Sequence, residues 1–125
     1  MFDYAHQRAL EVLGAPHAAV LVTNGPAGLQ VGEFACALSG LNLYLRVPQT
    51  SDHLFNVEHA STVTLLINRC EVKGSAQIIP RDIVDLDCAL LQEPEADWCA
   101  FLRVEISQVH LRSEAGWGNR ETIDL

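Results

Sequence analysis

The stretch that decides the fold is Leu41–Ile67, LNLYLRVPQTSDHLFNVEHASTVTLLI. Alternate residues of its first part, Leu41–Val47, are apolar, which is the period of a half-buried strand. Pro48 ends this strand because proline has no amide hydrogen to donate to a ladder. Ser51 then caps a short helix, and the two-residue period returns over Val63–Ile67. The block therefore predicts a strand, a turn, a helix and a second strand.

The flanking sequence predicts mostly strands joined by hairpin turns. We expect helices over residues 3–13 and from Asp82, and strands over residues 18–23, 29–38, 71–79 and from Trp98 onward. Gly74 indicates a bulge or a close backbone approach, and a change of apolar parity at Ser107 indicates a second bulge. Because helices do not alternate with strands, parallel βαβ units are disfavoured. A small, mostly β barrel of about six antiparallel strands with peripheral short helices is predicted.

Composition limits the class of protein. The 125 residues, 49% of them hydrophobic, are enough for one folded domain over residues 1–125. The net charge of −8 argues against a nucleic-acid partner and against anionic membrane surfaces. No apolar run reaches the ~20 residues of a membrane span, and the N-terminus lacks the pattern of a signal peptide. The four cysteines show no Cys-x-x-Cys pair, so a cytoplasmic protein with reduced thiols is expected.

The order of elements, with Ser51 opening the helix and Asn56 leading through Ala60 into the next strand, resembles the FMN-binding split-barrel proteins related to pyridoxamine 5'-phosphate oxidase. The resemblance implies a six-stranded antiparallel split β-barrel. It also implies a homodimer with FMN between the subunits, and an oxidoreductase that passes electrons between a reduced donor and an acceptor. The cofactor carries such chemistry, so no catalytic side chain is named.

The same resemblance implies the phosphate site. Family members hold the phosphate with a Ser-Arg-Lys or Ser-x-Lys pattern at the helix start, where this chain has Ser51, Asp52 and His53. Ser51 and a protonated His53 would bind the phosphate, with Arg46 as a weaker candidate, whereas Asp52 would repel it. The alternatives are that Ser51 is only a helix cap and that His53 is a surface residue. Arg69 is a further basic residue that could approach the phosphate site.

The C-terminal segment GWGNRETIDL also resembles the tails of these proteins. Trp117 would stack on a flat cofactor ring and Arg120 would pair with an anionic group. The alternative is that Trp117 packs on the barrel or a dimer interface and that Arg120 pairs with a nearby carboxylate.

Other functions remain open or unsupported. The five histidines show no zinc-ligand spacing, so no metal site is expected, whereas haem needs a single histidine and stays a minor option. The sequence does not separate FMN from a deazaflavin. The Gly-x-Ser-x-Gly, Gly-x-Gly-x-x-Gly and P-loop motifs are absent. Because the family's arginine and lysine are missing, a split barrel that has lost flavin and serves as a ligand-binding or interaction module is the alternative function.

Overall fold

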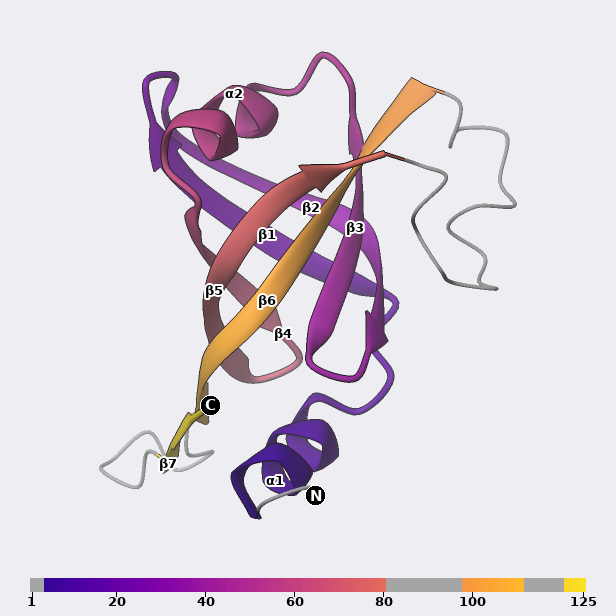
Figure 1. The fold of residues 1–125 in the computed structure, drawn as a ribbon, viewed down its shortest axis with the longest axis vertical. Helices are drawn as coiled ribbons and strands as arrows, with labels where there is room; N and C mark the ends of the chain where they lie inside the picture. Colours follow the sequence, from indigo (N-terminus) through magenta and orange to yellow (C-terminus); the bar gives the residue numbers. More distant parts are fainter. Residues whose placement is uncertain (1–3, 81–97, 112–120) are drawn as a thin grey trace.

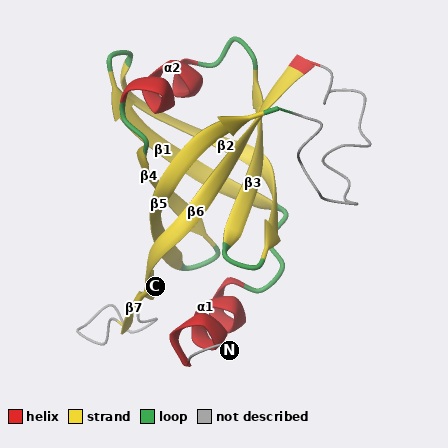
Figure 2. Ribbon diagram, in the orientation of Figure 1, coloured by secondary structure: helices red, strands yellow, loops and turns green. Residues whose placement is uncertain are grey.

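The computed structural model describes residues 4–80, 98–111 and 121–125. Seven strands and two helices make up these ranges (Figures 1 and 2). In chain order they are α1 (Tyr4–Leu13), β1 (Ala18–Gly25), β2 (Gly28–Ser39), β3 (Asn42–Pro48), α2 (Asp52–His59), β4 (Thr62–Ile67), β5 (Cys70–Ile79), β6 (Cys99–Leu111) and β7 (Glu121–Asp124). The predicted helix from Asp82 and the acidic loop at 92–97 lie outside the described residues.

The strands form one antiparallel sheet that closes on itself. The strand order is β3-β2-β1-β4-β5-β6-β7, and an additional pairing of β3 with β6 closes β1 to β6 into a barrel. Closure leaves those strands without the long exposed edges that an open sheet would have. The predicted six-stranded antiparallel barrel is therefore confirmed. The short strand β7, which the sequence did not predict, extends the sheet beyond β6.

The barrel interior is filled by the alternate apolar residues of the strands. The inward residues of β3, β4 and β6 are buried. They include Leu43, Leu45, Val47, Val63, Leu65, Ile67, Leu102 and Val104. The two helices lie at opposite ends of the barrel (Figure 1). In the described ranges, neither helix has the length and apolar character needed to cross a membrane.

One bulge interrupts the pairing of the two long strands, and it involves both positions that the sequence singled out, Gly74 of β5 and Ser107 of β6. The register of β5 with β6 shifts between Lys73 and Gly74, because Lys73 pairs with Gln108 while Gly74 pairs with Ile106. Ser107 has no partner in β5 and is the extra residue of the bulge. A Cβ on Gly74 would lie 2.5 Å from the carbonyl oxygen of Glu105, so only glycine allows this approach of the two backbones.

The apolar residues on both faces of Val63–Ile67 predict burial on both sides, which the single chain provides on one side only. Only the inward residues are buried, and the outward Leu66 is 41% exposed. The outward face of β4 has no described element packed over Leu66, and its apolar character therefore needs an explanation other than the core.

Candidate functional site

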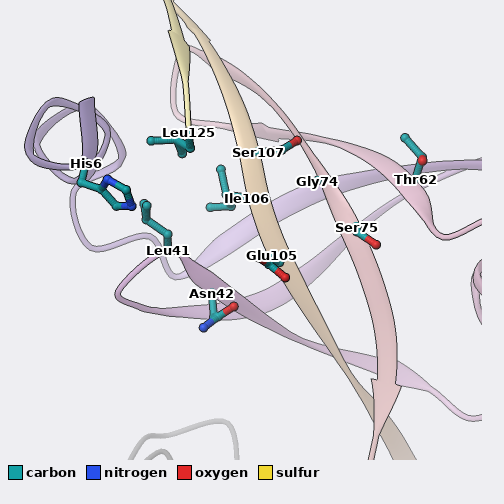
Figure 3. Close-up of a pocket in the computed structure, with 10 residues that line it drawn as sticks. All are labelled: His6, Leu41, Asn42, Thr62, Gly74, Ser75, Glu105, Ile106, Ser107 and Leu125. Atoms are coloured by element: carbon teal, nitrogen blue, oxygen red, sulfur yellow. The ribbon is translucent and has the colours of Figure 1, made fainter. Parts of the chain in front are cut away.

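A groove crosses the outer face of the barrel over β3, β6 and β5 (Figure 3). Its volume is about 520 Å³, within the range of small-molecule sites. A second hollow of about 280 Å³ adjoins it, and the two share Ser75 and Glu105. The groove is the larger of these two hollows, and we treat it as the candidate site.

The floor of the groove is a row of polar residues, one from each of four neighbouring strands. Asn42 of β3 pairs with Glu105 of β6, which pairs with Ser75 of β5, which pairs with Thr62 of β4. Residues directly opposite each other in antiparallel strands project from the same face of the sheet. The alternation that fills the interior with apolar side chains therefore places this row outside. Gly74, which precedes Ser75 on β5, also lines the groove.

The polar groups of this row are available to a ligand. Within the described residues, no hydrogen bond or ion pair of the Asn42, Ser75 or Glu105 side chain is found. In the adjoining hollow, Arg103 donates from Nη2 to Oε1 of Gln77 at 2.8 Å. A guanidinium has five N–H donors, so several remain. The site thus offers one carboxylate and one guanidinium on the same face of β6.

One end of the groove is apolar and is built from distant parts of the chain. Leu41, Ile106 and Leu125 line it together with His6 of α1, whose ring points toward Leu41 in Figure 3. An ion pair joins α1 to β7, the strand that precedes Leu125. Arg8 of α1 donates from Nε to Oε1 of Glu121 in β7 at 3.1 Å and from Nη2 to Oε2 at 3.0 Å. These hydrogen bonds lower the pKa of the Glu121 carboxyl.

The start of α2, where the resemblance places a phosphate, is already satisfied by the chain itself. Ser51 is the N-cap, and its Oγ accepts a hydrogen bond from the backbone N–H of His53 at 3.2 Å. Asp52 lies in the first turn, where a carboxylate complements the positive end of the helix dipole. The helix start therefore carries a negative side chain, and one of its amides is occupied by the cap.

His53 is buried, so its interpretation as a surface residue is wrong. The side chain is 5% exposed and points under α2 toward the β1–β2 hairpin. Its Nδ1 lies 2.8 Å from Oγ1 of Thr23, and its ring meets that of Phe34 edge-on, with centroids 5.3 Å apart. A Cβ on Gly32 would lie 3.3 Å from Nε2, so the neighbouring strand also approaches the ring closely.

Asn56 completes this buried polar cluster. It is fully buried and donates from Nδ2 to Oγ1 of Thr23 at 3.1 Å and to the carbonyl of Gly28 at 2.9 Å. Its Oδ1 accepts from the backbone N–H of Ala27 at 2.9 Å. Both Nδ2 hydrogens and Oδ1 of Asn56 are thus used to hold the hairpin against α2. Sequence reasoning missed this role because a polar residue on an amphipathic helix is normally assigned to the solvent side.

The residues present at α2 do not fit a flavin phosphate. Burial lowers the pKa of His53, and the neighbouring Asp52 only partly opposes this effect. Nδ1 of His53 shares a hydrogen bond with the Thr23 hydroxyl, in which either group can donate depending on the tautomer, and the lowered pKa favours the neutral ring. A neutral, inward-pointing histidine beside an exposed aspartate supplies no positive charge to an anion.

The other predicted site residues are not brought together at α2. Arg46 is on the outward face of β3, opposite Phe101 of β6. Arg69 is in the β4–β5 turn, next to Asn68, whose Nδ2 donates to the Leu13 carbonyl at the α1 end of the barrel. Trp117 and Arg120 lie outside the described residues. No group of three or more His, Cys, Asp and Glu side chains that could hold a metal ion is found in the described ranges.

Comparisons with known proteins support the fold. No protein-family model and no curated protein sequence matches the chain. The structure is similar to a Clostridium acetobutylicum protein of the pyridoxinephosphate oxidase family related to general stress protein 26. That match has a TM-score of 0.73 and 12% identity, and covers 100% of this chain and 97% of the other.

Two further solved structures have the same fold. General stress protein 26 from Bacillus anthracis matches with a TM-score of 0.69 and 16% identity, covering 97% of this chain and 96% of the other. A heme binding protein from Mycobacterium smegmatis matches with a TM-score of 0.72 and 14% identity, covering 99% of this chain and 59% of the other. The split-barrel fold of the pyridoxamine 5'-phosphate oxidase-like proteins, expected from the resemblance, is confirmed.

We predict that His53 makes the stability of the protein depend on pH. A histidine whose pKa is lowered by folding binds fewer protons in the native state than in the unfolded state. Its contribution is therefore fully present above the unfolded pKa of about 6.5 and is lost as the pH falls below that value. Urea unfolding at pH 8 and pH 5.5 measures the effect.

The variant His53→Gln, which has no titrating ring, should lose less stability between these two pH values than the wild type. His59→Gln, on the exposed side of the same helix, is the matched control and should keep the wild-type dependence. An equal loss in wild type and His53→Gln would contradict the assignment.

Proposed function

We propose that this protein is a split-barrel binding protein whose ligand, a small organic molecule, occupies the groove across β3, β6 and β5. The observation that carries the proposal is the row of unengaged polar side chains on the groove floor, Asn42, Ser75 and Glu105. Polar groups that converge on a hollow of this size, with an apolar end, have the composition of a ligand site. The function is binding, and no reaction is assigned.

The second candidate is an FMN-dependent oxidoreductase. It is favoured by the order of elements, by Ser51 at the start of α2 and by the likeness to a protein of the pyridoxinephosphate oxidase family. It is disfavoured by the charge at α2, because Asp52 is exposed there and His53 is turned inward. The electrostatics of the site thus favour the binding protein over the flavoenzyme.

Haem binding, the minor option, rests on the fold shared with the Mycobacterium smegmatis protein. His6 is the histidine that lines the groove, so it would be the ligand in that case. The absorbance spectrum of the purified protein separates the candidates. Haem and flavin absorb visible light, whereas the binding protein proposed above is expected to be colourless.

A homodimer is part of the proposal. The outward face of β2, β1 and β4 carries apolar residues in register: Val31 pairs with Val22, and Val20 pairs with Leu66. Val31 is 63% exposed and Leu66 is 41% exposed in the single chain. Contiguous exposed apolar residues on a sheet face are typical of a protein–protein interface. A second copy of the chain over this face would explain why β4 is apolar on both sides.

Nuclear magnetic resonance of the labelled protein, titrated with sugars, amino acids, nucleobases, carboxylates and amines, tests the binding site. We expect at least one class to shift the amide signals of Asn42, Ser75 and Glu105 before those of α2. Shifts confined to α2 and β3 near Arg46, or no shifts from any class, would contradict a ligand site in the groove.

Absorbance and an FMN titration test the choice between the two candidates. We expect the purified protein to show no flavin bands and no saturable FMN binding, because the phosphate would meet Asp52 without a cation. Saturable FMN binding that Ser51→Ala weakens at least tenfold would establish the flavoenzyme instead. Glu58→Gln, an exposed change on the same helix, is the control for both measurements.

Light scattering coupled to size exclusion tests the dimer. We expect the wild type to have twice the chain mass of 13.7 kDa. Val31→Lys combined with Leu66→Lys should give the monomer, because two charges would be buried in the interface. Lys73→Gln, an exposed change on β5 away from this face, should leave the mass unchanged. A monomeric wild type, or a double variant that still dimerises, would remove this face from the interface.

A further inference from the structure

The charges along the groove have a specific arrangement. Arg103 and Glu105 are two residues apart on β6, so both project from the outer face. Their Cα atoms are about 6.8 Å apart at the usual rise of a strand. Glu105 lines both hollows, and Arg103 lines the smaller one. Opposite charges thus border one continuous space.

These two residues do not neutralise each other. The described residues contain no ion pair between them, because Arg103 is held by the amide oxygen of Gln77 at 2.8 Å. Gln77 is directly opposite Arg103 in the β5–β6 ladder, which fixes the guanidinium over β5. The Glu105 carboxylate stands over Ser75 and Asn42, its neighbours in the ladder on either side. The space between the two charges is therefore open to a ligand.

The chemistry that fits such a space is a zwitterion with both charges on adjacent carbon atoms. An ammonium group would donate to the Glu105 carboxylate, and a carboxylate would accept from the remaining guanidinium donors of Arg103. A ligand carrying only one charge would leave the other protein group without its partner.

The apolar end of the groove specifies the rest of the molecule. Leu41 and Leu125 are partly exposed and line the end of the groove next to His6 of α1 (Figure 3), whereas Ile106 is 3% exposed and belongs to the core. A side chain extending from Glu105 toward this end would bury apolar surface against Leu41 and Leu125. Arg8 and Glu121 act as positioning residues, because their ion pair holds α1 against β7 behind this wall.

We propose that the groove binds a free α-amino acid with an apolar side chain, its ammonium on Glu105, its carboxylate on Arg103 and its side chain against Leu41 and Leu125. This assignment rests on the proposed function, since it names the ligand class of the same groove.

Titration with L-leucine and two analogues tests the assignment. The analogue 4-methylpentanoate lacks the ammonium group, and isopentylamine lacks the carboxylate. We expect L-leucine to shift the amide signals of Asn42, Ser75 and Glu105, and to bind at least tenfold more tightly than either analogue.

Two variants identify which protein group reads which charge. Glu105→Gln should weaken L-leucine at least fivefold and leave 4-methylpentanoate unchanged, because the latter has no ammonium. Arg103→Gln should weaken L-leucine to a similar degree and leave isopentylamine unchanged. Both changes are on the exposed face of β6, and Glu58→Gln on α2 is the control away from the groove.

The outcomes are distinct. If groove signals respond to other compounds but not to L-leucine, or if the two variants weaken all three compounds equally, the zwitterion assignment is overturned and the proposed function stands. If no compound of any class shifts the groove signals, both fall together.

Discussion

The hydrogen-bonded cluster of Thr23, His53 and Asn56 fixes how α2 packs on the barrel, and this packing determines which charges the start of α2 presents to a ligand. These three polar side chains are buried at 1%, 5% and 0% exposure, between a helix and a hairpin. Leaving one buried polar group without its partner costs about 1–3 kcal/mol, so the cluster is stable only as a whole. A Cβ on Gly25 would lie 2.9 Å from Oδ1 of Asn56, which shows how closely the helix and the hairpin approach.

This packing has an electrostatic consequence. A side chain that the helix start would otherwise present to an anion is instead turned inward and kept neutral. With Asp52 exposed beside it, the start of α2 presents a carboxylate where a phosphate would need a cation. The available polar groups lie on the outer face, in the groove over β5 and β6 next to the bulge at Ser107. The helix α2, on which the resemblance to flavin-binding split barrels rests, is therefore not part of the groove that is suited to a ligand.

Most strands could be predicted from the sequence because a two-residue apolar period is a direct consequence of pleated geometry. The bulge could also be predicted, because the sequence shows both Gly74 and the change of apolar parity after Ile106. The strand β7 was missed because its four residues contain one buried apolar side chain, Ile123, which is too little for a period. Its pairing is set by β6 and by the contact of Glu121 with Arg8.

The candidate site was less predictable. On α2 the apolar Phe55 is 47% exposed, while the helix buries the polar His53 and Asn56, so hydropathy alone points to the wrong face. Buried polar residues depend on partners from distant strands, here Thr23 and the turn before Gly28, and no local pattern identifies those partners. The groove floor was also invisible, because its row of residues is assembled only by the register of four strands.

The central claim is that His53 is a neutral structural residue and not a cation that holds a phosphate. The ring nitrogen resonances of His53, followed by proton–nitrogen correlation spectra across pH, test it most directly. The account predicts that the ring stays neutral through the range around pH 6.5 in which an unperturbed histidine titrates. A ring that becomes protonated in or above that range, or whose nitrogen signals move on addition of inorganic phosphate, would contradict it.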